Sequence, residues 1–177
     1  MRQLVVSEFV SLDGVMGEPQ DWSFPFANDE FMAFKREELW ASDAQLLGRK
    51  TYEGFAEAWP TRQGEFADRL NAAPKYVVST TLADAGWNNS HIIKTNVAAE
   101  IGALKASNGP DILVHGSRTL VQTLLSEGLI DELRLLVYPL VLGAGLRLFD
   151  STGVKLNLIE SKAFATGVVA LRYAPTR

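Results

Sequence analysis

The sequence predicts an α/β fold with a mixed, mostly parallel central sheet. Short apolar, β-branched segments alternate with segments of helical apolar spacing through most of the 177 residues. Such alternation is typical of parallel strands joined by helical crossovers. The last two apolar segments are separated by Thr166-Gly167, which predicts a closing antiparallel hairpin. The length is that of one domain, so we take residues 1–177 as a single domain.

The first elements are a strand, a loop and a helix. Residues 3–9 are apolar and β-branched, which predicts a strand. The turn signal Asp13-Gly14 follows, so the next residues predict a loop. Asn28 or Asp29 can cap the helix that comes next, because apolar residues then recur at helical spacing.

The middle of the chain contains three short apolar runs that predict strands. Residues 44–47 predict a buried strand that ends at Gly48, and a helix starts directly after it. Residues 76–78 and 91–93 predict two further strands. The intervening stretch, residues 59–74, is polar and is predicted to be a surface excursion.

The last part of the chain contains another strand–helix unit and the closing hairpin. Helical spacing predicts a helix over 97–105, and an apolar run predicts a strand over 111–114. Gly116 ends this strand, and a helix over 118–125 follows. The remaining strands are predicted at 133–138, 155–164 and 168–173.

Composition and charge argue against several classes of protein. The formal net charge is −4, whereas a nucleic-acid-binding domain usually carries a basic surface. Without cysteine the chain has no disulfide, thiolate metal site or cysteine nucleophile, and its two histidines show no metal-ligand spacing. No apolar run approaches the roughly 20 residues of a membrane helix, and the first residues do not resemble a signal peptide. We therefore expect a cytoplasmic protein with no membrane, nucleic-acid or metal partner.

Two strand–glycine–helix junctions are the strongest candidates for a binding site. Each places a glycine at the carboxyl end of a buried strand, where ligands of open α/β sheets bind. A helix start offers free N–H groups and a positive dipole end, which suit a phosphate, and glycine allows close approach. The residues are Gly48, Arg49, Lys50 and Thr51 in the first junction and Gly116, Ser117, Arg118 and Thr119 in the second. Either junction could instead be an ordinary strand end with a helix cap, and neither matches the Rossmann or Walker A fingerprint.

The candidate proton donors are Asp13, Asp29 and Glu30. A carboxyl group in a partly apolar cleft beside Trp22 and Phe26 would have a raised pKa and could donate a proton. The alternative is structural, with Asp13 belonging to its turn and Asp29 capping the helix.

Four segments follow one another along nearly the whole chain: SLDG at 11–14, LGRKTY at 47–52, VHGS with TL at 114–120, and DE with PLVLGAG at 131–145. In this order they resemble the dihydrofolate reductase superfamily. The best match is its bacterial branch related to the reductase domain of the bifunctional riboflavin-biosynthesis deaminase–reductase.

This resemblance implies a three-layer dihydrofolate reductase-like fold, with helices on both faces of the sheet, and a homodimer. It implies an oxidoreductase that transfers hydride from NADPH to a C=N or C=O carbon. The two junctions would hold the NADPH phosphates, and Ser79 and Thr80 would lie near the adenosine 2′-phosphate. The loop 12–17 would cover the nicotinamide, and Leu12 would line the substrate side with Trp22 and Phe26.

Two departures from the family pattern bear on the substrate. Counting back from Phe34-Lys35-Arg36 puts Glu30 at the family's acid position, with Asp29 adjacent, across a longer loop that leaves the register open. The arginine that binds the glutamate tail of folate falls at about Ala73 and is missing. A buried carboxylate without its cation is disfavoured, which argues against dihydrofolate itself. The Pro139–Gly145 segment favours a ribosylamino-pyrimidine of riboflavin biosynthesis, with a pterin as the alternative.

Two other functions compete with a reductase. The chain could be a nucleotide-binding module that has lost turnover, or a structural subunit whose pocket is filled by Trp22 and Phe24. Whether Asp29 or Glu30 reaches the nicotinamide face separates the first of these from an enzyme. For the homodimer, the strand 133–138 and the segment to Leu148-Phe149 could supply an interface, or the strand could belong to the core.

Overall fold

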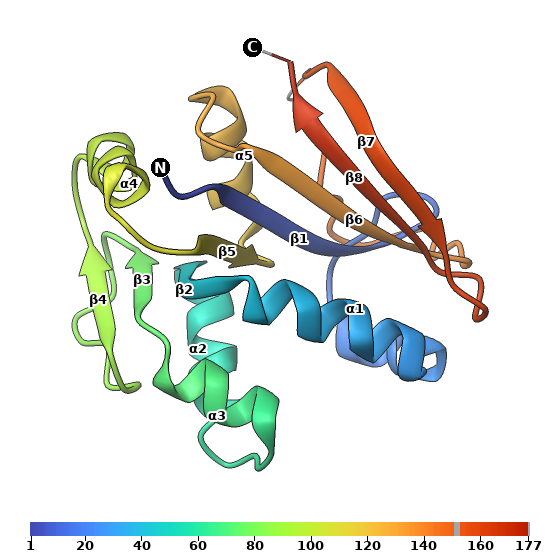
Figure 1. The fold of residues 1–177 in the computed structure, drawn as a ribbon, viewed down its shortest axis with the longest axis horizontal. Helices are drawn as coiled ribbons and strands as arrows, with labels where there is room; N and C mark the ends of the chain where they lie inside the picture. Colours follow the sequence, from blue (N-terminus) through green and yellow to red (C-terminus); the bar gives the residue numbers. More distant parts are fainter. Residues whose placement is uncertain (151–152, 177) are drawn as a thin grey trace.

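The computed structural model describes residues 1–150 and 153–176 and contains one eight-stranded sheet (Figure 1), in the order β4-β3-β2-β5-β1-β6-β8-β7. The strands are β1 (Leu4–Ser11), β2 (Ser42–Gly48), β3 (Lys75–Val78), β4 (Ser90–Ile93), β5 (Asp111–His115), β6 (Glu132–Tyr138), β7 (Leu156–Ala163) and β8 (Val169–Pro175). The helices are α1 (Asp29–Trp40), α2 (Arg49–Ala58), α3 (Glu65–Ala72), α4 (Val97–Ala106) and α5 (Arg118–Ser126). Two short 3₁₀ turns, Pro19–Asp21 and Phe24–Phe26, lie in the loop before α1.

The sheet is parallel from β4 to β6 and antiparallel beyond it. β1 pairs in parallel with β5 and β6, and β2 pairs in parallel with β3 and β5. β8 pairs antiparallel with both β6 and β7, so the predicted closing hairpin is confirmed. Because the first six strands of this order are parallel, their carboxyl ends meet along one edge of the sheet, which is called the carboxyl edge below.

Helices cover both faces of the sheet, which confirms the predicted three-layer arrangement (Figure 1). On one face, α4 and α5 pack apolar residues such as Ile101 and Leu124 against Val6 and Val114 of the central strands. On the other face, α1, α2 and α3 supply buried residues such as Leu39, Tyr52 and Leu70. Alternate residues of β1 therefore enter different cores, as the two-residue period of a strand requires.

The structure differs from the sequence prediction in the polar stretch 59–74. It contains the helix α3, in which Ala67 and Leu70 are buried against the sheet. Phe66 and Leu70 are four residues apart and so share one helix face, a short signal within an otherwise polar segment. The helix is tied to β2 by Arg69, whose guanidinium donates to the carbonyl oxygen of Ser42 at 2.6 Å.

β6 is a core strand. It lies between β1 and β8, and Leu133, Leu136 and Tyr138 are at most 1% exposed. Leu148, in the segment after it, is buried as well. The strand β6 therefore belongs to the core, whereas the segment after it exposes Val141 and Leu146, at 67% and 51%, and its role in an interface stays a prediction. None of the helices in the described part of the chain combines the length and apolar character that a membrane span needs.

Candidate functional site

The two glycine junctions predicted from the sequence meet at the carboxyl edge, because β2 and β5 are neighbours in the sheet. The Gly48 N–H donates to Ser117 Oγ at 2.8 Å, and the Ser117 N–H donates to Thr51 Oγ1 at 2.9 Å. Ser117 Oγ in turn donates to the carbonyl oxygen of His115 at 2.9 Å. These bonds join two segments nearly seventy residues apart into one unit.

Gly116 occupies a position at which a side chain does not fit. Its φ is +53°, in the left-handed region that favours glycine. A Cβ placed there would lie 2.8 Å from Thr51 Oγ1 and 3.2 Å from Thr51 Cγ2. The bare glycine thus lets the start of α5 approach the start of α2.

Both helix starts at this unit lack a side-chain cap. Gly48 precedes α2 and Ser117 precedes α5, and neither supplies a capping hydrogen bond within the described chain. The hydroxyl of Ser117 is used across the junction instead. First-turn N–H groups of an uncapped helix are free to bind an anion, and the positive dipole end favours negative charge. Two such starts side by side fit a ligand with two phosphates.

The three cations of these junctions have different roles. Arg49 pairs with Glu53 one turn along α2, at 3.1 Å. Arg118 donates to the carbonyl oxygen of Arg147 and pairs with Asp150, so it ties α5 to the loop before β7. Lys50 is exposed, and no hydrogen bond or ion pair of its side chain occurs among residues 1–150 and 153–176. Lys50 is therefore the cation left available to a phosphate.

Ser79 and Thr80 extend this site along the edge, because β3 is the next strand beyond β2. Ser79 is buried, and its Oγ accepts from the N–H groups of Thr81 and Leu82 at 3.2 and 2.9 Å. Its hydroxyl thus shapes the turn after β3. Thr80, after β3, and Thr119, in the first turn of α5, are both exposed.

Asp13 is bound into the loops at the end of β1. Its carboxylate accepts from Ser11 Oγ at 2.6 Å and from the N–H groups of Leu142 and Gly143 at 3.1 and 2.9 Å. These hydrogen bonds, that from Ser11 first, lower the pKa of Asp13 to about 2. The group is ionised at neutral pH and has no proton to donate, so it serves to hold the loop after β6 against the loop after β1.

Asp29 and Glu30 lie at the other end of the carboxyl edge. The cap of α1 is Asn28, whose Oδ1 accepts from the Phe31 N–H at 2.9 Å, and Asp29 is exposed. Glu30 accepts from the Ala165 N–H at 3.1 Å and lies 3.8 Å from Lys162 Nζ. Glu30 is thus held at the β7–β8 hairpin, whereas the glycine junctions lie on β2 and β5.

Trp22 and Phe26 pack into an aromatic cluster between α1 and the sheet. Their rings lie 5.1 and 5.6 Å from that of Tyr138, and Trp22 Nε1 donates to the Gly17 carbonyl oxygen at 3.0 Å. Leu12 and Phe24, in contrast, are 67% and 64% exposed. Trp22 and Phe26 therefore anchor the loop, Leu12 is free for contact, and Phe24 fills no pocket. The cluster comprises Phe9, Trp22, Phe26, Phe31, Phe34, Tyr138 and Phe164.

Two polar residues beside the junctions have strongly shifted pKa values, and one of them, the buried acid Glu8, was missed by the sequence prediction. Glu8 on β1 is 2% exposed, and burial raises its pKa well above the ordinary value, with Lys35 opposing. Burial first and then Lys35 lower the pKa of His115 to about 3. Glu8 Oε1 and His115 Nε2 have no hydrogen-bond partner in the described structure. The available signal was a charged residue inside the apolar run of β1.

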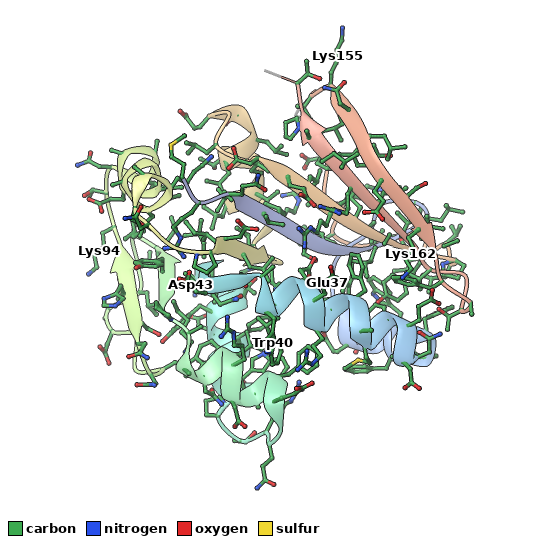
Figure 2. The ribbon with its side chains drawn as sticks, in the orientation of Figure 1. Glu37, Trp40, Asp43, Lys94, Lys155 and Lys162 are labelled. Atoms are coloured by element: carbon green, nitrogen blue, oxygen red, sulfur yellow. The ribbon has the colours of Figure 1, made fainter. Side chains whose placement is uncertain are left out.

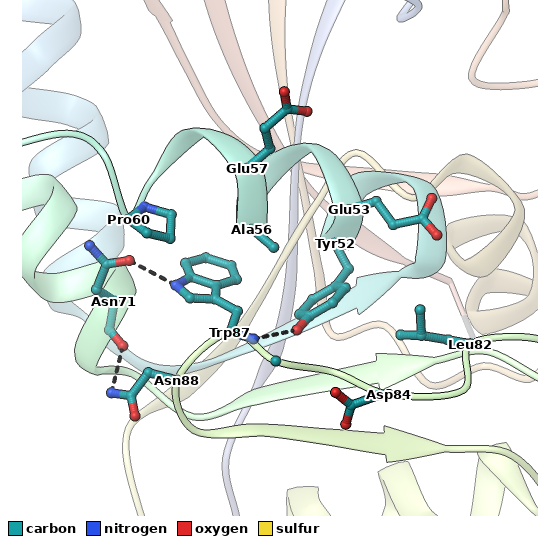
Figure 3. A pocket seen from close by; sticks show the side chains of 11 residues that line it. Tyr52, Glu53, Ala56, Glu57, Pro60, Asn71, Leu82, Asp84, Trp87 and Asn88 are labelled. Carbon is teal, nitrogen blue, oxygen red and sulfur yellow. Dashed lines mark hydrogen bonds between the residues drawn. The ribbon is translucent and has the colours of Figure 1, made fainter.

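A separate groove of about 690 Å³ lies between α2 and the loop that follows β3 (Figure 3). Polar groups that line this groove are hydrogen-bonded to one another: Trp87 Nε1 donates to Asn71 at 2.7 Å, and Tyr52 Oη accepts from the Trp87 N–H at 3.0 Å. Its rim is acidic, with Glu53, Glu57 and Asp84. None of the residues predicted for the site lines this groove.

Comparison with known proteins identifies relatives over the whole chain. Residues 2–170 match the model of the RibD C-terminal domain family. The uncharacterized protein YyaP of Bacillus subtilis (strain 168) is 30% identical over 97% of this chain and 94% of its own length.

Solved structures share the fold at lower identity. A protein of Shewanella sp. PV-4 named for riboflavin biosynthesis has a TM-score of 0.78 at 22% identity, with 99% of each chain covered. A pyrimidine reductase-like protein of Corynebacterium diphtheriae has a TM-score of 0.70 at 16% identity, with 99% of this chain and 92% of that chain covered.

Proposed function

Because the chain belongs to the RibD C-terminal domain family, we propose that it is an NADPH-dependent reductase acting on a small nitrogen heterocycle. A ribosylamino-pyrimidine like that of riboflavin biosynthesis is the favoured substrate. The observation that carries the proposal is the meeting of two uncapped helix starts at the carboxyl edge, beside the available cation Lys50. The relatives named for riboflavin biosynthesis and pyrimidine reduction support the choice of substrate class.

Each part of the edge has a role in this proposal. The first-turn N–H groups of α2 and α5 bind the pyrophosphate, and Lys50 binds a phosphate oxygen. The turn at Ser79 and Thr80 holds the adenosine end, and the loop 12–17 covers the reactive end and excludes water. When bound, NADPH supplies the hydride. Of the three acids predicted from the sequence, Asp29 and Glu30 remain the proposed proton donors, because Asp13 is bound into the loops after β1 and β6.

Titration calorimetry of the purified protein with NADPH and NADH tests this function. We expect one NADPH per chain, bound more tightly than NADH, followed by hydride transfer to a pyrimidine or pterin in a substrate screen. NADPH binding without any turnover would favour a nucleotide-binding module. Absence of binding of both cofactors at millimolar concentration would overturn the reductase proposal.

Lys50→Ala should weaken NADPH binding about tenfold and NADH binding less, because a lysine that reaches the 2′-phosphate loses its partner only in NADPH. The measurement is the ratio of the two dissociation constants at one stated ionic strength. Lys155→Ala is the matched control, since Lys155 is exposed beside β7, at the end opposite Lys162 (Figure 2). If the variant loses the same affinity for both cofactors, Lys50 binds the pyrophosphate and not the 2′-phosphate.

We also propose that the protein is a homodimer that pairs through β7. This strand ends the sheet and is exposed along nearly its whole length, with Leu158 and Ile159 57% and 51% exposed. If two copies pair antiparallel about Ser161, Glu160 of one lies opposite Lys162 of the other, which makes the edge complementary to itself. An exposed edge strand is a template for such pairing.

Light scattering should give the mass of two chains for the wild type at micromolar concentration. Lys162→Glu should shift the protein toward the monomer, because like charges then face each other across the pair. Glu160→Lys combined with Lys162→Glu restores opposite charges and should restore the dimer. A wild type that stays monomeric at high concentration would refute this interface.

A further inference from the structure

Glu8 is a buried acid on β1, the strand next to β5, at whose end the Gly116 junction lies. Its carboxyl group lies near the backbone N–H of Gly116, which favours the charged form and so opposes the effect of burial on the pKa, and Oε1 has no hydrogen-bond partner within the described residues. The side chain is 2% exposed. A buried polar atom without a partner costs free energy, so its presence beside a ligand site calls for an explanation.

The position of Glu8 along the carboxyl edge decides which part of a dinucleotide could reach it. The strands follow the order β3, β2, β5, β1. With the adenosine end at Ser79 on β3 and the pyrophosphate between β2 and β5, the reactive ring extends over β1. Glu8 lies on β1, three residues before the end of that strand.

The chemistry of an uncharged carboxylic acid matches the group that this ring carries. A protonated glutamate offers an O–H donor and a carbonyl acceptor. A primary carboxamide offers an acceptor oxygen and N–H donors in the same side-by-side arrangement. Burial favours the uncharged form of Glu8, and the negative phosphates nearby would disfavour an ionised carboxylate further.

We propose that Glu8, as an uncharged acid, binds the carboxamide of the nicotinamide ring through the side of its carboxyl group that Gly116 leaves free. This assignment rests on the proposed NADPH-dependent function. It makes Glu8 a cofactor-positioning residue, which sets the rotation of the ring about its bond to the ribose. The phosphates depend on other groups, namely Lys50 and the two helix starts.

The nicotinamide ring would reach Glu8 through a movement of the loop 12–17. Val15 and Met16 are 2% and 7% exposed, and Met16 packs in the same core as Val6 and Val10, the neighbours of Glu8 on that face of β1. Methionine is unbranched and adapts to a changed cavity shape. Met16 of the loop 12–17 thus packs on the face of β1 that carries Glu8, and we expect this loop to shift when the ring enters.

Calorimetric titration with two ligands tests this role: NADPH, and 2′-phospho-ADP-ribose, which has the same phosphates but no nicotinamide. Glu8→Leu should weaken NADPH about tenfold and leave 2′-phospho-ADP-ribose within twofold. Glu8→Gln should retain most of the NADPH affinity, because an amide supplies both a donor and an acceptor. Gln45→Leu is the matched control, since Gln45 is also fully buried with unpartnered side-chain atoms, on β2. Thermal unfolding of each variant checks that it is folded.

The outcomes separate the two proposals. If Glu8→Leu weakens the binding of both ligands equally, Glu8 acts only through the backbone of Gly116. That result would overturn the proposed contact with the ring, but it would leave the proposal of an NADPH-dependent function standing. Unchanged affinity for NADPH in folded Glu8→Leu would overturn it as well. A wild type that binds neither ligand would overturn the proposed function itself, and the role of Glu8 with it.

Discussion

Gly116→Ala should lower the free energy of unfolding by about 3 kcal/mol and weaken NADPH binding more than tenfold. Alanine at the left-handed φ of +53° costs about 1 kcal/mol, and the added Cβ, 2.8 Å from Thr51 Oγ1, forces apart two packed segments at about 2 kcal/mol. The same displacement breaks the bond from the Ser117 N–H to Thr51 and separates the two helix starts. Chemical denaturation and calorimetric titration measure the two effects.

Gly128→Ala is the matched control for the backbone cost. Gly128 also has a positive φ, +64°, but a Cβ there would meet no atom within 4 Å, so only the conformational cost of about 1 kcal/mol remains. Thr51→Ala should remove much of the clash when it is combined with Gly116→Ala. If Gly116→Ala is no more destabilising than Gly128→Ala, the close approach of the two junctions is not as described.

The wild type should lose about 1.5 kcal/mol more stability than His115→Leu when the pH falls from 6.5 to 5. The pKa of His115 is lowered to about 3 in the folded protein and is near 6.5 in the unfolded chain. In this range the unfolded state binds a proton that the folded state does not, so stability falls as the pH falls. Denaturant titration of both proteins at several pH values gives the difference in slope.

His91→Leu is the control for this experiment, because His91 is exposed and is the only other histidine in the chain. The free energy of unfolding of His91→Leu should depend on pH as steeply as that of the wild type. Among the other shifted groups, Glu38 interacts electrostatically with His115, so the measured difference includes that interaction. Asp13, with a pKa near 2, matters only below about pH 4, and Glu8 contributes equally to all three proteins. Equal slopes for the wild type and His115→Leu would mean that His115 is protonated without cost in the folded state.

The sequence by itself determined most of the strands and helices, including those on either side of the two glycine junctions. Apolar runs that end at Gly48 and Gly116, each followed by helical spacing, are local patterns, and the structure has a strand and a helix at both. The turn at Thr166-Gly167 likewise predicted the antiparallel hairpin. Helix α3 was not predicted because Phe66 and Leu70 are only a short apolar signal within a polar stretch. Packing of these residues against the rest of the protein stabilises the helix.

Only the tertiary structure decided which side chains are free to act. Arg49 and Arg118 look alike in sequence as helix-start cations, yet Glu53 and Asp150 occupy them and leave Lys50 available. Asp13 resembles a candidate acid until the hydroxyl of Ser11, together with the N–H groups of Leu142 and Gly143 about 130 residues away, holds it ionised. Glu8 is a charged residue within an apolar run, and only the structure shows that it is 2% exposed. The physical reason is that charge state and availability depend on desolvation and on hydrogen-bond and ion-pair partners. Several of these partners, such as Asp150 for Arg118 and Leu142 and Gly143 for Asp13, are distant in sequence, so no local pattern encodes them.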